Sequence, residues 1–473
     1  MAWHVHVPRE TRSRVKEPAV WLIMFNNWWA RRFFFYVAAL VVISVPVALP
    51  QIMGLSQGFR ATDVGSMRYV RELIFVVAFA DFVITLIAVK SCNLPKDIAL
   101  VLLAALAYIF VLLWKDVSAG NDPLMAIFAF RMFLIAMFLV YATVAFAGAR
   151  FALPQMIGFV IQLYIICACL AAVWELRTFP PLFYGATFLG PRVPVLAPSP
   201  ILFSQVASTM LLYLFVIRAR WFPIWAMMVF FLCLATGGRS GIIGTFLVFG
   251  LYLTFDTPGG LGLRVLKMVG MLGLAFGLYL AASSQSISGR ANVNSLTEEA
   301  RIDNWIELIQ SMGSEAPMTV LFGTQLGMGT NAAFSSARTG LQSSNMPALE
   351  FSDSFFIATY LNFGLVGVAL ILAGVTIFVM RGFNSDFRER AGIGGMFVWL
   401  GLAQNIIEIH PANVVLMTCF GLAIAQRYRQ TAPAPQRYHA RSYQPDYEPD
   451  MPAQHPEPPL LGPQRDHPVQ GGI

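Results

Sequence analysis

Long apolar runs alternate with short polar connections along most of the chain. A bilayer core about 30 Å thick needs about 20 helical residues, and each run has about 16 to 26 residues. The pattern therefore predicts about twelve transmembrane helices joined mostly by short loops. The predicted spans are 33–53, 72–89, 97–114, 124–148, 153–176, 200–217, 221–236, 241–256, 265–283, 354–380, 394–409 and 412–426.

The composition supports a membrane protein. The chain of 473 residues is 57% hydrophobic and 12% charged, whereas a soluble protein has about 25% charged residues. The predicted fold is thus an all-α integral membrane bundle of about twelve helices with the lipid bilayer around it. The net charge of +7 then belongs to loops at the membrane surface, and it does not indicate nucleic-acid binding.

Lysine and arginine gather on one side of the predicted helices, which places both termini in the cytoplasm. Residues 1–32 form a basic interfacial segment, and 33–283 form a bundle of about nine helices. Residues 284–353 form one large, partly helical periplasmic loop, followed by about three more helices over 354–426. The Pro-rich tail 427–473 is predicted to be a disordered cytoplasmic segment.

The stretch "LATGGRSGIIG" at 234–244 places Arg239 between glycines in a short hairpin. The flanking runs have about 16 residues, so each helix rises only about 24 Å. Arg239 is then recessed below the outer membrane surface, where a guanidinium is costly unless it lines a polar cavity or meets a partner. The alternative is an ordinary short hairpin whose arginine extends to the lipid headgroups.

Other candidate groups lie on the predicted outer side. Arg301 and Trp305 share a side of an amphipathic helix in "SLTEEARIDNWIELIQSMG". Asp353 is placed to cap the next helix, or to act as an acid or base. Glu408 and His410 lie in "NIIEIHPAN", where the imidazole is a candidate base. An exposed helix end before the proline explains this pair equally well.

Three further polar residues, Asp81, Arg131 and Glu175, lie in apolar runs, and Asp81 and Arg131 lie mid-helix and must face the bundle interior. One interpretation pairs Asp81 with Arg131. Four of the five cysteines lie in apolar runs, and five of the six histidines lie in the terminal segments. We therefore expect no disulfide framework, metal site or cofactor.

The order of these parts resembles the O-antigen polymerase and ligase family, the Wzy- and WaaL-like enzymes. The hairpin "ATGGRSGIIG" carries the arginine, and "GPRVPVLAPSPILFSQVAS" precedes it. Downstream lie Arg301 and Trp305, then "LFGTQLGMG", and then the helix "SFFIATYLNFGLVGVAL". The similarity covers residues 185–380.

This resemblance implies a GT-C-like bundle in the bacterial inner membrane that polymerises undecaprenyl-pyrophosphate-linked repeat units on its periplasmic face. The products would be capsular, exopolysaccharide or O-antigen chains, and a chain-length regulator is a possible partner. Arginines would stabilise the leaving pyrophosphate by bidentate contacts, and one residue would accept the acceptor proton. The implied catalytic residues are Arg239, Arg301, Asp353 and His410, and the implied substrate-binding residues are Arg192, Arg290 and Glu408.

The sequence departs from the family where a His-Asn pair usually ends the outer loop, because Asp353 and Ser354 stand there. The missing histidine favours a polymerase over a ligase, which remains an alternative. A polysaccharide flippase or other transporter is an alternative of another class, although no related halves are visible. A third alternative is a peptidoglycan-type glycosyltransferase of the shape, elongation and division class, although the acidic loop motif of that class is not recognisable in this sequence.

Overall fold

The structure is a computed structural model. It describes residues 28–45, 65–88, 96–120, 123–148, 152–178, 186–187, 190–197, 200–256, 306–307, 309–310, 316–327, 354–381, 387–405 and 409–431, with isolated positions between 260 and 273. Contacts between residues divide the chain into two compact units, Met1–Arg429 and Gln430–Ile473. The account below concerns the first of these units.

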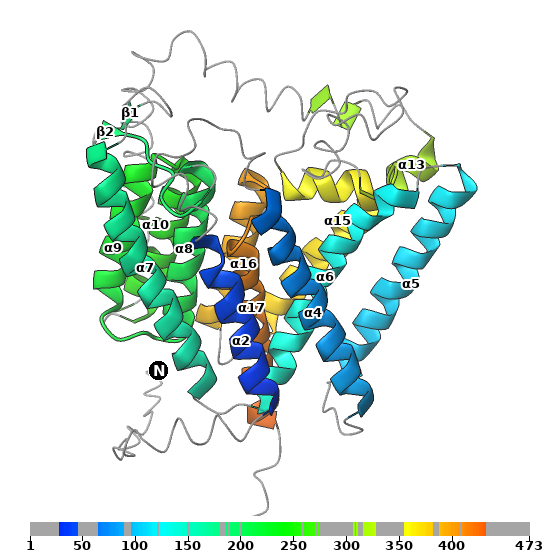
Figure 1. Cartoon of the computed structure of the whole chain (residues 1–473), viewed down its shortest axis with the longest axis horizontal. Coiled ribbons are helices and arrows are strands. Elements are labelled where there is room, and N and C mark those ends of the chain that lie inside the picture. Colours follow the sequence, from blue (N-terminus) through cyan, green and yellow to red (C-terminus); the bar gives the residue numbers. More distant parts are fainter. Residues whose placement is uncertain are drawn as a thin grey trace, which may run out of the picture. The chain divides into compact units, whose positions relative to one another are not determined.

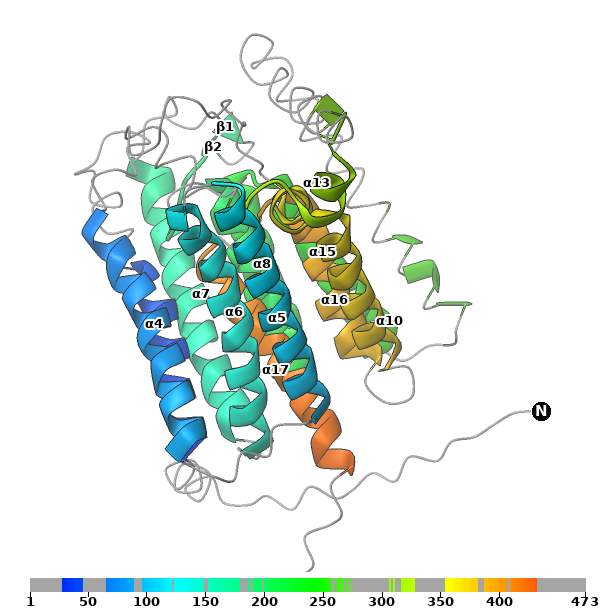
Figure 2. The same ribbon diagram turned by 90° about the vertical axis from the view of Figure 1, so that its right-hand side faces the viewer.

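The described residues form long helices that run side by side (Figures 1 and 2). The first half holds α2 (Trp28–Val42), α4 (Gly65–Ala88), α5 (Lys96–Ser118), α6 (Pro123–Gly148) and α7 (Ala152–Thr178). The second half holds α8 (Pro200–Val216), α9 (Phe222–Thr236), α10 (Arg239–Phe255), the short α13 (Pro317–Phe322), α15 (Phe355–Met380), α16 (Phe387–Ala403) and α17 (Ala412–Thr431). Strands β1 (Ala186–Thr187) and β2 (Gly190–Pro191) pair antiparallel before α8.

Each predicted span contains a described helix except 265–283, which lies largely outside the described residues. Most boundaries agree closely. The prediction was wrong for α16, which begins at Phe387 and ends at Ala403 rather than covering 394–409. Its first turn holds Arg388, Glu389 and Arg390, which are buried and bonded inside the protein. Hydropathy alone placed the start of this helix after these charged residues, but the helix includes them.

The helix α2 also starts earlier than predicted, and it includes Arg32. The Arg32 guanidinium pairs with Asp81 of α4 and lies 3.7 Å from the centre of the Trp28 ring. Tyr141 of α6 donates a hydrogen bond to the same carboxylate at 3.3 Å. The described partners of Asp81 are thus Arg32 and Tyr141, whereas the side chain of Arg131 lies outside the described part.

Two described helices, Leu153–Thr178 and Phe355–Met380, are long and apolar enough to cross a membrane by length and composition. Only 17% of the most apolar window of the second is buried inside the protein. Leu370, Ile377 and Met380 are among its exposed side chains. A core helix of a soluble protein would bury such a surface, so this exposure favours a lipid environment. That all twelve spans cross a membrane stays a prediction.

The helix α8 is the centre of the second half. Every residue from Phe203 to Val216 is buried, and α8 packs against α7, α9, α10 and α16. The loop before α8, the α9–α10 turn, the start of α15 and the end of α16 lie together, because hydrogen bonds connect them. We call this the hairpin end.

The opposite end of these helices carries a charge network around two buried residues, Arg388 and Glu389. Arg388 pairs with Asp256, which follows α10, and with Glu389 at 3.2 Å, and Glu389 pairs with Arg218 at 3.1 Å. Arg388 also donates to the Phe215 carbonyl near the end of α8 at 3.1 Å. The same carbonyl accepts the Arg218 N–H at 3.1 Å, so Arg388 adds a second hydrogen bond at the end of α8. We call this the ion-pair end.

Candidate functional site

The turn between α9 and α10 is a two-glycine connection. Gly237 ends α9 with φ 61°, in the left-handed region that glycine adopts without strain. Gly238 precedes α10, and Arg239 is the first helical residue. A Cβ atom on Gly238 or on Gly241 would overlap Ser204 of α8. These glycines therefore let the start of α10 lie directly against α8.

Hydrogen bonds from two other helices hold this turn. The Gln205 amide of α8 donates to the Ser240 hydroxyl at 2.9 Å. The Trp399 indole of α16 donates to the Ser240 carbonyl at 2.9 Å. Ser240 is thus fixed through both its side chain and its backbone. The adjacent Arg239 consequently starts from a rigid backbone position.

Arg192 follows β2 and lies against the end of α9. Its Nε atom donates to the Thr236 carbonyl at 2.9 Å, and its Nη2 atom donates to the Gly237 carbonyl at 3.3 Å. A cation at a helix C-terminus is favourable, because the last carbonyls carry partial negative charge. Arg192 therefore has a structural role, and it places a guanidinium beside the hairpin.

Arg239 has the opposite electrostatic position. It is partly exposed at the N-terminus of α10, where the helix dipole is positive and a cation is unfavourable by about 0.3 to 1 kcal/mol. The first turns of α10 and of the neighbouring α8 contain no acidic residue. An anion bound here would interact favourably with the guanidinium and with the helix end together.

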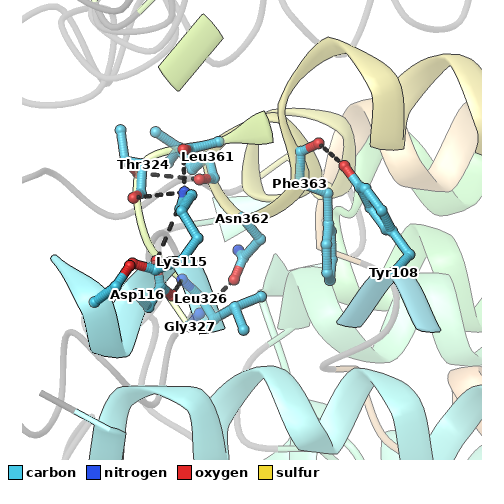
Figure 3. A network of polar contacts seen from close by, with 11 residues as sticks. Tyr108, Lys115, Asp116, Thr324, Leu326, Gly327, Leu361, Asn362 and Phe363 are labelled. Carbon is cyan, nitrogen blue, oxygen red and sulfur yellow. Dashed lines mark hydrogen bonds and ion pairs between the residues drawn. The ribbon is translucent and has the colours of Figure 1, made fainter. Parts of the chain in front are cut away.

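A separate candidate feature is the segment 321–327, which has the sequence "LFGTQLG" and is held to the end of α5 by hydrogen bonds (Figure 3). The Lys115 ammonium donates to the Gly323 carbonyl at 2.7 Å and to the Thr324 carbonyl at 3.2 Å. The Asp116 carboxylate accepts the Leu326 N–H at 2.8 Å. Both charged groups act on backbone atoms, so they fix the course of this segment.

The same segment also packs against a kink in α15. Gly364 interrupts that helix with φ 64° and ψ −167°. Thr324 donates its N–H to the Leu361 carbonyl at 2.9 Å, and the Asn362 side chain accepts the Gly327 N–H. The Tyr108 hydroxyl of α5 donates to the Phe363 carbonyl at 2.9 Å (Figure 3). Helices α5 and α15 therefore hold the segment from two sides.

The kink predicts a large difference between two glycines of one helix. Replacing Gly364 by alanine puts a Cβ onto the Leu321 carbonyl and forces alanine into a positive φ. We expect Gly364→Ala to lower the free energy of unfolding by about 1 to 3 kcal/mol. Gly374 has open space around its Cβ position, so Gly374→Ala should be neutral or stabilising by up to about 1 kcal/mol.

The measurement is SDS-driven unfolding of both variants in mixed micelles, with hydrogen exchange of a peptide covering 316–327. Gly364→Ala should also raise exchange in that peptide, and Gly374→Ala should not. Equal behaviour of the two variants would show that the segment does not depend on the kink.

The structure brings together only some of the predicted site residues. Arg192 and Arg239 lie at the same turn. His410 contacts the Leu40 carbonyl of α2 through Nε2, and its ring lies 6.1 Å from that of Phe75 in α4. Its described neighbours are thus α2 and α4, whereas Arg192 contacts α9. The remaining predicted residues, Arg290, Arg301, Asp353 and Glu408, lie outside the described residues.

Several residues of this region were not predicted as site residues. Asp116, Asn362 and Gln205 are buried polar residues. Asp116 and Asn362 accept hydrogen bonds from backbone N–H groups of the segment 321–327, and Gln205 donates one to the Ser240 hydroxyl of the hairpin. One usable sign in the sequence is that Lys115 and Asp116 are adjacent charges at the end of an apolar run. The described residues contain no group of three histidine, cysteine, aspartate or glutamate side chains able to hold a metal.

Comparison with known proteins gives no match. No protein-family model matches the chain, and no curated protein is significantly similar to it in sequence. The resemblance to the O-antigen polymerase and ligase family therefore rests on the sequence motifs and their order along the chain.

Proposed function

We propose that this protein is a membrane glycosyltransferase that polymerises undecaprenyl-pyrophosphate-linked oligosaccharide units into capsular, exopolysaccharide or O-antigen chains. The proposed location is the bacterial inner membrane, with both termini in the cytoplasm and the hairpin end on the periplasmic side. The ion-pair end would face the cytoplasm, and its loops and helix ends carry Arg218, Arg220, Arg381, Arg388 and Arg390. That distribution agrees with the excess of basic residues expected on the cytoplasmic side.

The observation that carries the proposal is the position of Arg239. A cation at the N-terminus of α10 is unfavourable for the helix itself, yet the hairpin holds its backbone through Gly238, Ser240 and Gly241. A bound pyrophosphate would reverse this cost, since it is attracted by the guanidinium and by the helix end. Arg192 adds a second guanidinium at the same turn.

The reaction that suits this arrangement is a displacement at the anomeric carbon of the lipid-linked donor. The hydroxyl oxygen of an acceptor sugar forms the new glycosidic bond, and the bond from the anomeric carbon to the pyrophosphate oxygen breaks. The acceptor proton passes to a base, for which Asp353, His410 and Glu408 are the candidates. Negative charge grows on the departing pyrophosphate, and fixed cations in a water-poor site stabilise such charge strongly.

The test is the glycan profile of a strain that lacks the gene, resolved by size, together with extraction of lipid-linked intermediates. Loss of polymer, with single repeat units accumulating on the outer-leaflet carrier, supports the proposal. Accumulation of full-length polymer on the carrier would instead identify a ligase. Single units retained on the cytoplasmic leaflet would identify a flippase. An unchanged glycan and lipid profile would reject all three functions.

A further inference from the structure

Glu175 is a fully buried carboxyl group near the end of α7. Its Oε2 atom accepts the backbone N–H of Val195 at 2.8 Å. Val195 has a φ of 57°, which is the left-handed region. A β-branched residue is rarely found there, and the conformation costs about 1 to 2 kcal/mol. It persists only where the surrounding structure holds it in place.

The strained residue belongs to the short segment 192–197 that carries Arg192. The Val193 N–H donates to the Ala235 carbonyl of α9 at 3.2 Å. The Tyr164 hydroxyl of α7 donates to the Leu196 carbonyl at 3.4 Å. The side chains of Val193 and Val195 are completely buried. The segment is therefore held by hydrogen bonds to α7 and to α9.

These contacts form one connected path. Glu175 fixes the turn at Val195, and the turn sets the direction of the three preceding residues. Arg192, at the start of this stretch, then reaches the Thr236 and Gly237 carbonyls. Gly237 is two positions before Arg239. Since Glu175 has no exposed surface, it can act only through this backbone and not on a substrate directly.

We propose that Glu175 is a positioning residue for the pyrophosphate site. Its carboxyl group maintains the left-handed turn at Val195 and thereby holds the Arg192 guanidinium against the α9–α10 hairpin. The identity of the ligand rests on the proposed function, whereas the positioning path itself does not.

The path is tested first by hydrogen exchange, which needs no knowledge of the substrate. Glu175→Ala removes the acceptor of the Val195 N–H, so exchange should rise at least tenfold in peptides covering 192–197 and 234–242. Glu175→Gln keeps an acceptor oxygen, and it should leave both peptides close to wild type. The control Glu72→Ala removes a carboxylate that pairs with the adjacent Arg71 in α4, and it should change neither peptide.

The consequence for the reaction is tested by the initial rate of polymerisation in proteoliposomes loaded with lipid-linked repeat units. We expect Glu175→Ala to lower this rate at least tenfold and Glu175→Gln to preserve most of it. Because Glu175 acts through Arg192, the Glu175→Ala/Arg192→Ala double variant should be no slower than Arg192→Ala alone.

The outcomes separate the two proposals. If Glu175→Ala raises exchange but the wild-type protein makes no polymer in the proteoliposomes, the positioning path stands and the proposed function fails. If the wild-type protein polymerises and Glu175→Ala raises exchange without slowing polymerisation, the role of Glu175 in the pyrophosphate site is overturned. If Arg239→Ala is inactive while Glu175→Ala changes neither exchange nor rate, the inference is overturned. Multiplying effects of the Glu175 and Arg192 variants would overturn it as well.

Discussion

Arg239→Ala should abolish polymer formation while the protein remains in the membrane at its normal level. Removal of one preorganised donor from a site that stabilises developing negative charge lowers a rate about a hundredfold to a thousandfold. Arg239 lies in the first turn of α10 and is not one of the buried core residues. The expected effect is therefore on the reaction rather than on folding.

The experiment complements the deletion strain with each variant and compares the size distribution of the glycan. Arg239→Lys keeps the charge but loses the planar fork that binds phosphate through two bonds, so it should give intermediate activity. Arg220→Ala is the matched control, because Arg220 is an exposed arginine in the loop between α8 and α9 at the ion-pair end. Full-length polymer from Arg239→Ala at normal protein level would remove the basis of the proposed pyrophosphate site.

The two arginines of the hairpin lie at helix ends of opposite polarity, so we expect them to have different roles. Arg192 satisfies the carbonyls at the end of α9, and this requirement exists whether or not a ligand is bound. Arg239 lies at the opposite kind of helix end, where the dipole of α10 disfavours a cation. Loss of Arg192 should thus disturb both the hairpin and the reaction, whereas loss of Arg239 should disturb mainly the reaction.

The helices could be predicted from the sequence, because apolar runs of membrane length are a strong signal. Their ends could be predicted only where polar residues are exposed. In α16 the polar residues Arg388, Glu389 and Arg390 are buried, so composition gave the wrong start. Arg32 likewise lies within α2, because its guanidinium forms an ion pair with Asp81 of α4, which is distant in sequence. Such pairings depend on the fold, and a single sequence does not contain them.

The candidate site could be predicted only in part, for the same reason. The glycines around Arg239 marked a tight turn, and the structure shows that two of them also admit Ser204 of α8. The hydrogen bond of Glu175 to Val195 crosses between a helix and a loop, and no local pattern reveals it. The hydrogen bonds that Lys115 and Asp116 make to the segment 321–327 likewise follow only from the fold.

The ion-pair end should be the most sensitive part of the protein to a single charge removal. Arg388 is buried, its guanidinium carbon lies 4.1 Å from the centre of the Phe215 ring, and it pairs with Asp256 and Glu389. Replacing Arg388 by methionine keeps apolar volume but leaves two carboxylates without this partner. Breaking a fully buried pair on one side costs about 3 to 5 kcal/mol, and we expect a loss of about 1 to 3 kcal/mol here, because Asp256 is exposed and Glu389 keeps its pair with Arg218.

We expect that loss for Arg388→Met in the free energy of unfolding, measured by SDS titration in mixed micelles. Arg220→Met removes an exposed arginine, and it should change the free energy by no more than about 0.5 kcal/mol. Arg388→Lys should lie between the two, because a lysine keeps the charge but cannot bridge two carboxylates and a carbonyl with a planar fork. Equal stability of the two methionine variants would mean that water or lipid headgroups compensate the carboxylates. The network would then link the ends of α8, α10 and α16 without stabilising them.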